Sequence, residues 1–197
     1  MARRLLTLAL VAVLVIAAVL LVDNPTLEEP QQQAPQQNTP GAIITAATTR
    51  QYDANGQLQY VLQVDRAEQY FRFNQQDKPL ATSRGYTDLS SPRLVLHSDS
   101  NPQPWHFSAD HGRTENNGNL ITLWGNVVAE QALAGGGQYR IETSRLRVEP
   151  LLQQATSQQP VTIRSPQGLG NSTGMSIDMP QQTVTLNSQV KATYEAK

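Results

Sequence analysis

The segment Asn119-Leu-Ile-Thr-Leu-Trp-Gly-Asn-Val-Val128 contains a polar turn, a short apolar strand, a Gly-Asn corner and a second strand. Related segments follow at Ala155-Thr-Ser-Gln-Gln-Pro-Val-Thr-Ile163 and Thr183-Val-Thr-Leu-Asn-Ser-Gln-Val190, spaced by 34 and then 29 residues at the aligned valines. Self-similarity at this period predicts stacked supersecondary units, each burying its neighbour's apolar face. The alternative is the ordinary succession of strands and turns in any all-β chain.

Composition excludes several classes of function. The 197 residues carry a net charge of −1 with scattered Lys and Arg, so nothing indicates a nucleic-acid-binding surface. The chain has no cysteine, which rules out disulfides, thiolate chemistry, cysteine-ligated zinc and a lipidated cysteine anchor.

The N-terminus predicts a membrane anchor. Residues 1–4 include two arginines and are expected in the cytoplasm, and residues 5–22 are apolar except for Thr7. Eighteen helical residues span about 27 Å, close to a hydrocarbon core of about 30 Å. A cleaved signal peptide is the alternative, but Val22-Asp-Asn-Pro25 makes a poor cleavage site. The predicted anchor positions are Leu5, Leu10, Leu14, Leu20 and Val22.

Residues 23–41 form a predicted linker between the anchor and a domain at 42–197. Four prolines separated by glutamines cannot build a core and favour extended conformations. In polyproline geometry, at about 3.1 Å per residue, such a tether reaches up to about 50 Å from the membrane.

From Ile43 onward the alternation of residues is that of strands, and no window sustains a helical period. Strand 43–52 enters a hairpin turn at Asp53-Ala-Asn-Gly56, and the next strand has period two through Val64. We expect a further strand at 67–73, a loop at 74–86, and strands at 93–97 and 105–109. The domain is therefore predicted to be all-β, as a sandwich, a barrel or a jelly roll.

One face of each strand is expected to turn inward, because few apolar runs are long enough for strands buried on both faces. Whether this inward face seals a core or surrounds an apolar channel stays open. The predicted inward residues are Leu58, Tyr60, Leu62, Val64, Trp105, Phe107, Leu123, Val127, Ile141, Ile163, Ile177 and Leu186.

The search for catalytic chemistry favours no enzyme and no cofactor or metal. His106 and His111 are five apart, which on one strand puts them on opposite faces and prevents a shared metal unless the strand bends. Nothing marks Ser108, near Asp110, as a nucleophile. The glycine-rich segment Gly168–Gly174 lacks the lysine of a phosphate loop and is interpreted as a hairpin corner.

The basic N-terminus with one span, the polar tether and two motifs together resemble the LptC family of bacterial lipopolysaccharide transport. The motifs are Tyr52-Asp-Ala-Asn-Gly-Gln-Leu-Gln-Tyr60 and Leu123-Trp-Gly-Asn-Val127, with Gly174-Met-Ser-Ile-Asp-Met179 downstream. The resemblance covers essentially the whole chain. Where the family often keeps a Gly-x-Val corner, this chain has Pro160-Val161 and Ser188-Gln-Val190.

The resemblance implies an open periplasmic β-jelly roll of short antiparallel strands, anchored in the inner membrane of a Gram-negative bacterium by a single pass. Its inward residues would form a groove for the acyl chains of lipopolysaccharide. The lipid would come from the LptB, LptF and LptG transporter, contacted by the N-terminal helix and edge strand, and pass to LptA at the C-terminal edge.

Unpaired edge strands are natural sites of strand addition, and neither terminal strand contains proline. Ordinary edges protected by loops are the alternative. The candidate docking residues are Ile43, Thr48, Arg50, Gly174, Val190, Thr193 and Tyr194.

Two rival classes remain open. One is an envelope structural or tethering module with a closed core and no lipid transfer. The other is a carbohydrate-binding or hydrolytic jelly roll, which would need clustered carboxylates and exposed aromatic residues on one sheet.

Overall fold

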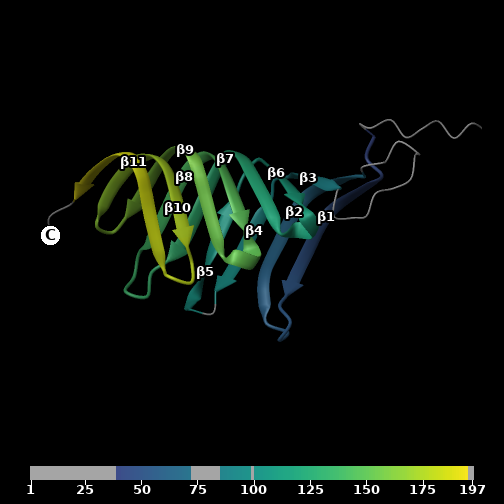
Figure 1. Cartoon of the computed structure of the whole chain (residues 1–197), viewed down its shortest axis with the longest axis horizontal. Helices are drawn as coiled ribbons and strands as arrows, with labels where there is room; N and C mark the ends of the chain where they lie inside the picture. The colour runs from purple at the N-terminus through teal and green to yellow at the C-terminus, as the bar shows by residue number, and fades with distance from the viewer. Residues whose placement is uncertain (1–38, 72–84, 99, 195–197) are drawn as a thin grey trace, which may run out of the picture. The chain divides into compact units, whose positions relative to one another are not determined.

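The computed structural model describes residues 39–71, 85–98 and 100–194. In this part of the chain eleven antiparallel strands form one sheet, accompanied by two short 3-10 helices, η2 (Asn116–Gly118) and η3 (Pro150–Leu152) (Figure 1). The all-β prediction is confirmed. The strands are β1 (Ala42–Tyr52), β2 (Leu58–Tyr70), β3 (Tyr86–Ser90), β4 (Arg93–Ser98), β5 (Asn101–Ser108), β6 (His111–Glu115), β7 (Leu120–Ala132), β8 (Gln138–Glu149), β9 (Gln154–Ser165), β10 (Gly168–Asp178) and β11 (Thr183–Tyr194).

The strand pairing is a simple meander. β2 pairs along its length with β4 and then β3, and β7 pairs likewise with β6 and then β5. β3 and β4 are therefore the two parts of one interrupted strand, and β5 and β6 are the two parts of another. These two interrupted strands pair with each other, β3 with β6 and β4 with β5. Every segment pairs with its neighbours in sequence, which leaves β1 and β11 as the two edges.

The sheet bends sharply along a line that crosses its strands near their middle. We call this the fold line and define it by residues with positive φ that lie within the strands or at the break between β3 and β4. It divides the sheet into a β3/β6 half-sheet and a β4/β5 half-sheet, whose inward faces pack against each other. The fold-line residues are Ala46, Ser91, Gly125, Asn126, Gly174 and Gln189.

Polar groups satisfy the backbone where the ladder is interrupted at the fold line. The Asp110 amide donates to the Gly125 carbonyl at 2.9 Å, and the Asn126 side chain donates to the Asp110 carboxylate at 2.7 Å. Ser157 and Ser188 hydroxyls donate to backbone carbonyls of neighbouring strands at 2.8 and 2.9 Å. Since an unpaired buried backbone group costs about 1–3 kcal/mol, these contacts allow the strands that they join to bend without that penalty.

The fold line corrects several sequence-based boundaries. The Gly-Asn corner at Gly125 lies inside the single strand β7 and joins no two separate strands. The glycine-rich segment Gly168–Gly174 lies in β10, so it is no hairpin corner. The strand expected at 67–73 begins as the continuation of β2, and its last two residues lie outside the described residues, as does most of the loop expected at 74–86.

The ~30-residue repeat and the first hairpin agree with the sequence analysis. β7, β9 and β11 run in the same direction and each begins after a turn, so the period corresponds to one pair of antiparallel strands. At the first hairpin, the Asp53 carboxylate accepts hydrogen bonds from the Asn55 and Gln57 amides at 2.8 and 2.7 Å, and Gly56 has φ +80°.

Replacement of Gly174 by alanine should destabilise the domain. Gly174 has φ +81°, and an added Cβ would lie 3.3 Å from the Ser157 carbonyl oxygen and 3.0 Å from the Asn187 amide nitrogen. The left-handed conformation costs a non-glycine residue about 1–2 kcal/mol, so we expect urea unfolding to show a loss of at least that size. Gly135→Ala is the control, since a Cβ there meets nothing within 4 Å. Equal stability of both variants would contradict the assigned role of the bend.

Candidate functional site

The space between the two half-sheets, which we call the trough, is lined by continuous rows of side chains in register across all strands. One row lies on each half-sheet and runs from edge to edge. On the β4/β5 half-sheet it comprises Thr49, Leu62, Leu94, Phe107, Ala129, Ile141, Ile163, Gly170 and Ala192. On the β3/β6 half-sheet it comprises Ala42, Gln69, Thr87, Thr114, Ile121, Val148, Ala155, Ile177 and Val184.

The residues predicted to turn inward are buried or half-buried. Leu58, Ile163 and Leu186 are half-buried, and the last two pack against the core. The others are at most 7% exposed and belong to the core: Tyr60, Leu62, Val64, Trp105, Phe107, Leu123, Val127, Ile141 and Ile177. Their burial shows where they lie; contact with lipid stays a prediction.

The middle of the trough is packed closely. Leu94, Phe107, Ile121, Leu123 and Leu146 are each no more than 2% exposed. Trp105 and Phe107 stack with ring centroids 6.0 Å apart, a favourable offset aromatic pair. In this conformation the centre of the trough is therefore a core that contains no open channel.

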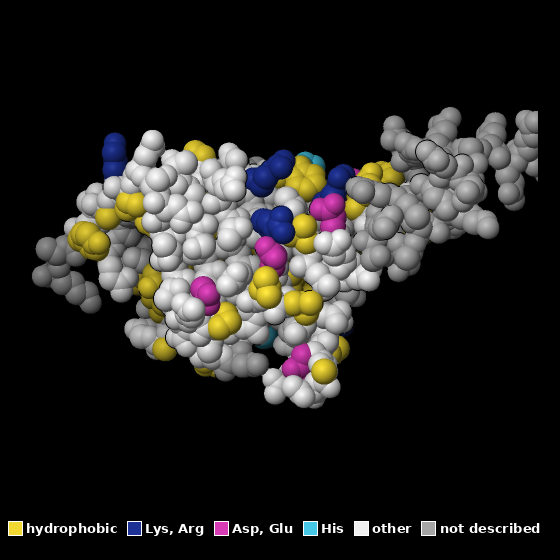
Figure 2. All heavy atoms as spheres, in the orientation of Figure 1, with side chains coloured by type: hydrophobic (Ala, Val, Ile, Leu, Met, Phe, Trp, Pro, Cys, Tyr) yellow, Lys and Arg dark blue, Asp and Glu magenta, His cyan; other side chains and the backbone are white. Residues whose placement is uncertain are grey.

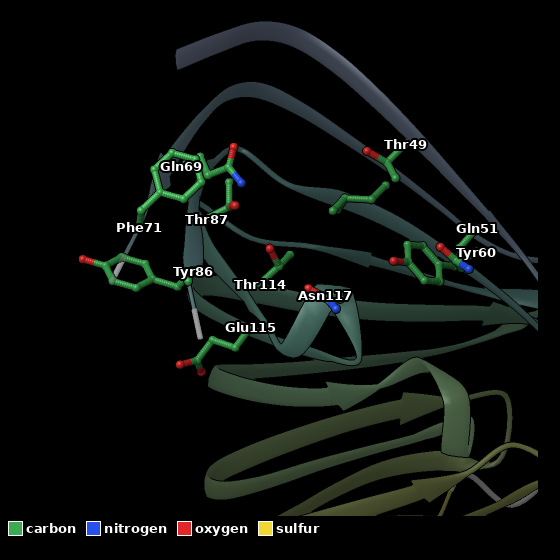
Figure 3. Close-up of a pocket in the computed structure, with 13 residues that line it drawn as sticks. Thr49, Gln51, Tyr60, Gln69, Phe71, Tyr86, Thr87, Thr114, Glu115 and Asn117 are labelled. Carbon is green, nitrogen blue, oxygen red and sulfur yellow. The ribbon is translucent and has the colours of Figure 1, made fainter. Parts of the chain in front are cut away.

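The end of the trough beside β1 is hollow. A cavity of about 260 Å³ lies between β1, β2, β3, β6 and η2 (Figure 3). A second cavity of about 210 Å³ shares several lining residues with it. The Tyr60 ring enters the first cavity, and burial raises the pKa of its phenol. Gly118 in η2 approaches this hydroxyl so closely that an added Cβ would lie 2.7 Å from it.

The end beside β11 holds a further cavity of about 170 Å³. Side chains of both half-sheets line it, among them Trp105, Ile163, Ile177, Val184 and Leu186. Gly170 faces the same interior, because a Cβ there would lie 2.8 Å from the Ile163 side chain. The trough is thus packed in its centre and hollow at both ends.

Hydrogen bonds join the half-sheets on the side opposite the fold line. We call these residues the latch: Ser98, Ser100, Gln153, Met179 and Gln182. The Ser98 hydroxyl donates to the Gln153 side chain at 2.8 Å, and the Ser100 hydroxyl donates to the Met179 carbonyl at 3.0 Å. Gln182 donates to the Ser100 carbonyl. These hydrogen bonds connect the two half-sheets across the trough.

The N-terminal edge strand β1 is exposed along almost its whole length. Ile43, Ile44 and Tyr52 are 50–53% exposed, and Thr48 and Arg50 are exposed as well. β1 pairs only with β2, so its other side offers backbone groups for pairing. These positions lie where the docking prediction requires an edge.

The C-terminal edge strand β11 is exposed throughout its second half. Val190 and Tyr194 are 51% and 78% exposed, and Thr193 pairs only with Leu169 of β10. Gly174, also proposed as a docking residue, does not lie on an edge. It is buried in β10 between β9 and β11, so the structure gives it a role in the fold line.

No charged side chain of the described residues lies in the two rows that line the trough, although Glu115 and Asp178 border the end cavities. Arg140 bridges Glu130 and Glu142, and Arg164 also pairs with Glu142 at 2.7 Å. Hydrogen bonds from these two arginines lower the pKa of the Glu142 carboxyl. Figure 2 shows basic and acidic side chains beside one another on the face in view, with no patch of a single sign there.

The described residues contain no group of three His, Cys, Asp or Glu side chains able to hold a metal. His106 and His111 lie on different strands, β5 and β6, so their expected placement on opposite faces of one strand was wrong. His111 stacks on Trp124 at 6.0 Å, and Asp110 accepts a hydrogen bond at the fold line. These contacts are structural.

Within residues 39–71, 85–98 and 100–194 no helix is long and apolar enough to cross a membrane. The predicted anchor at residues 5–22 and most of the linker lie outside the described residues.

A family model described as lipopolysaccharide-assembly, LptC-related, matches residues 8–195. The chain belongs to the LptC family. Membership of the LptC family assigns the chain to lipopolysaccharide transport. Proteins of this family are inner-membrane-anchored periplasmic transport components and are not known as enzymes. No curated protein matches the chain.

A solved structure with a similar fold is LptH from Pseudomonas aeruginosa, described as the LptA-homologous periplasmic component of the lipopolysaccharide transport device. The TM-score is 0.52 at 11% sequence identity, over 70% of this chain and 95% of LptH. At this identity the likeness concerns the fold alone, and it supports the β-jelly-roll assignment of this LptC-family chain.

Sequence reasoning missed the latch and the inward polar residues beside β1. Ser98 and Gln153 are separated by 55 residues, and both are polar residues next to turns, which no local pattern distinguishes from solvent-exposed ones. The inward positions of the period-two alternation include the polar residues Gln69, Thr87 and Thr114. Counting polar as well as apolar residues at these alternating positions would have predicted that they face inward.

Truncation in the packed centre should cost far more stability than truncation at a hollow end. Leu94→Ala removes a side chain that is 1% exposed, and we expect a loss of about 2–5 kcal/mol in the free energy of unfolding. Leu186→Ala removes the same atoms from a half-buried side chain at the C-terminal cavity, where we expect less than about 1.5 kcal/mol. Urea denaturation measures both, and similar losses would contradict the distinction between centre and ends.

Proposed function

We propose that this domain receives lipopolysaccharide at its β1 end and passes it to LptA at its β11 end, holding the acyl chains in the trough. The observation that carries the proposal is the trough itself. The rows of side chains that line it are uncharged and mainly apolar, the trough is hollow at both ends, and an unpaired edge strand lies at each end. The LptC family assignment supports it.

Acyl chains demand an apolar lining. Each methylene removed from water gains roughly 0.8 kcal/mol, so several chains together gain a large free energy in a trough of this kind. A deep, closed pocket would hold the lipid too strongly for transfer. A trough that opens along its latch side, supplied by an ATP-driven transporter, allows both uptake and release.

The end cavities are too small for whole acyl chains. A cavity of about 150 Å³ accommodates benzene, so a cavity of about 260 Å³ holds roughly ten carbon atoms on the same scale. Lipid binding therefore requires the half-sheets to separate. The fold line acts as the hinge, and the latch is the side that opens.

The two edge strands provide the connections to the neighbouring proteins. β1 would pair with the periplasmic domains of the LptB, LptF and LptG transporter, and β11 would pair with LptA, so that the sheet continues from one protein into the next. The predicted helix at residues 5–22 would pack beside the transporter and hold the domain at the inner membrane.

The packed centre favours a second candidate, an envelope structural module whose interior takes no lipid. The two functions differ in whether inward residues contact lipopolysaccharide in cells, and this can be measured directly.

Photo-crosslinking amino acids at inward positions should capture lipopolysaccharide. Ile163 lines the cavity beside β11, and its neighbour Arg164 faces outward; Leu62 and Gln63 form the same kind of pair near β1. We expect lipid adducts from Ile163 and Leu62 and few from Arg164 and Gln63, detected by immunoblotting after irradiation of growing cells. No adduct from the inward sites in cells with active transport would favour the structural module.

Locking the latch should stop lipid uptake. Because the chain has no cysteine, Ser98→Cys with Gln153→Cys places the only two thiols across the latch, where a short cleavable thiol crosslinker can join them. We expect lipopolysaccharide adducts to fall at least tenfold on crosslinking and to return on reduction. The control pair Thr162→Cys and Asn171→Cys joins neighbours within one half-sheet and should change nothing. Full lipid uptake by the locked protein would exclude opening at this side.

Proline in one edge strand should weaken the contact with the neighbouring protein at that edge and leave the contact at the other edge unchanged. Proline cannot donate a backbone hydrogen bond, so Thr48→Pro should weaken contact with the transporter, and Thr193→Pro contact with LptA. Co-purification measures each contact, and circular dichroism confirms that both variants are folded. Survival of both contacts in both variants would rule out strand addition.

A further inference from the structure

The lining of the trough changes from polar to apolar along its length. On the β3/β6 half-sheet, the inward row is polar at Gln69, Thr87 and Thr114, and apolar from Ile121 onward. On the β4/β5 half-sheet, Thr49 and Gln51 of β1 occupy inward register positions that are apolar on the next strands. Polar side chains of the inward rows of both half-sheets therefore meet at the end beside β1. At the β11 end the two rows are apolar, and the polar side chains that line the cavity there, such as Ser98 and Gln182, lie outside the rows.

These side chains line one cavity. The cavity of about 260 Å³ is bounded by Thr49 and Gln51 on one side, and by Gln69, Thr87 and Thr114 on the other (Figure 3). Thr87 and Thr114 are direct cross-strand partners, which places two hydroxyls side by side. Hydroxyl and amide groups both donate and accept hydrogen bonds.

The cavity lacks the features of a phosphate site. Among the described residues, its lining contains no Lys or Arg, and the one charged residue there is Glu115. Arg113, the nearest arginine along β6, is held instead by Asp88 in a two-pronged pair at 2.6 and 3.0 Å and stacks on Tyr86 at 3.9 Å. A phosphate would meet repulsion from Glu115 and no cationic partner among these described residues.

Aromatic rings complete the lining. Tyr60, Phe71 and Tyr86 surround the hydroxyl and amide groups, and the Tyr60 phenol lies in a partly desolvated position. Uncharged hydrogen-bonding groups together with aromatic faces suit a sugar ring or the amide and hydroxyl groups through which acyl chains are attached to it.

We infer that the polar cavity beside β1 is a binding site for the uncharged, hydroxyl- and amide-bearing sugar–acyl junction of lipopolysaccharide. This inference rests on the proposed function and adds a subsite to it. The acyl chains extend from the junction into the apolar part of the trough. A lipid without such a junction gains nothing from the polar cavity, so the site distinguishes lipopolysaccharide from other acyl lipids.

The test compares two probes on the full-length protein in detergent: purified lipopolysaccharide and a fatty acid of the same chain length. Thr87→Val with Thr114→Val removes both hydroxyls and keeps the β-branched shape. Each neutral hydrogen bond contributes about 0.5–1.5 kcal/mol, so we expect the affinity for lipopolysaccharide to fall about tenfold and the affinity for the fatty acid to stay unchanged. Thr122→Val, on the outward face of the adjacent strand β7, is the matched control and should bind both probes normally.

Equal losses for both probes, or no loss for either, would overturn the inference. Ile163→Asp separates this result from a failure of the proposed function, because it places a charge in the cavity at the other end. If Ile163→Asp abolishes binding of both probes while the double valine variant binds lipopolysaccharide like the wild type, only the polar site is wrong. If the wild type binds neither probe, the proposed function and this inference fall together.

Discussion

The fold line is the constraint on which this structure depends. The eleven strands form a meander of nine long segments, since β3 with β4 and β5 with β6 each make one segment. If this meander stayed flat it would expose one apolar face, and the bend along the fold line packs that face against itself. Glycine at Gly174 and hydrogen-bonding side chains such as Asn126 and Ser157 make the bend possible, because they accommodate positive φ or satisfy interrupted backbone groups. The core, the trough and its two ends all follow from this bend.

Folding one sheet across its strands also explains why the edges stay open. In a closed barrel the first and last strands pair with each other, whereas here β1 and β11 lie at opposite ends of the meander. Their exposed apolar residues, Ile43, Ile44 and Val190, would be a hazard on an isolated protein. Such edges are useful in a component that joins other sheets on both sides, and the LptC family assignment fits that use.

The sequence was sufficient for the all-β class, the hairpin at Asp53 and the inward apolar set, because these depend on local alternation and turn chemistry. The bends were not predictable in the same way. A Gly-Asn pair such as Gly125-Asn126 favours positive φ in a hairpin turn and in a bulge alike, and only its long-range partners decide between the two. The separation of Ser98 from Gln153 hid the latch for the same reason, and the error over His106 and His111 arose from an unseen break between β5 and β6.

A packed centre and a transport function are compatible because the cohesion of the two half-sheets is unevenly distributed. The covalent chain crosses the fold line in every segment of the meander, whereas the opposite side is joined by a few latch hydrogen bonds, each contributing about 0.5–1.5 kcal/mol. The contacts that must be lost on opening are therefore mainly apolar, between side chains such as Leu94 and Leu146. An acyl chain offers those same side chains a new apolar surface, so lipid entry restores much of the hydrophobic stabilisation that separation removes.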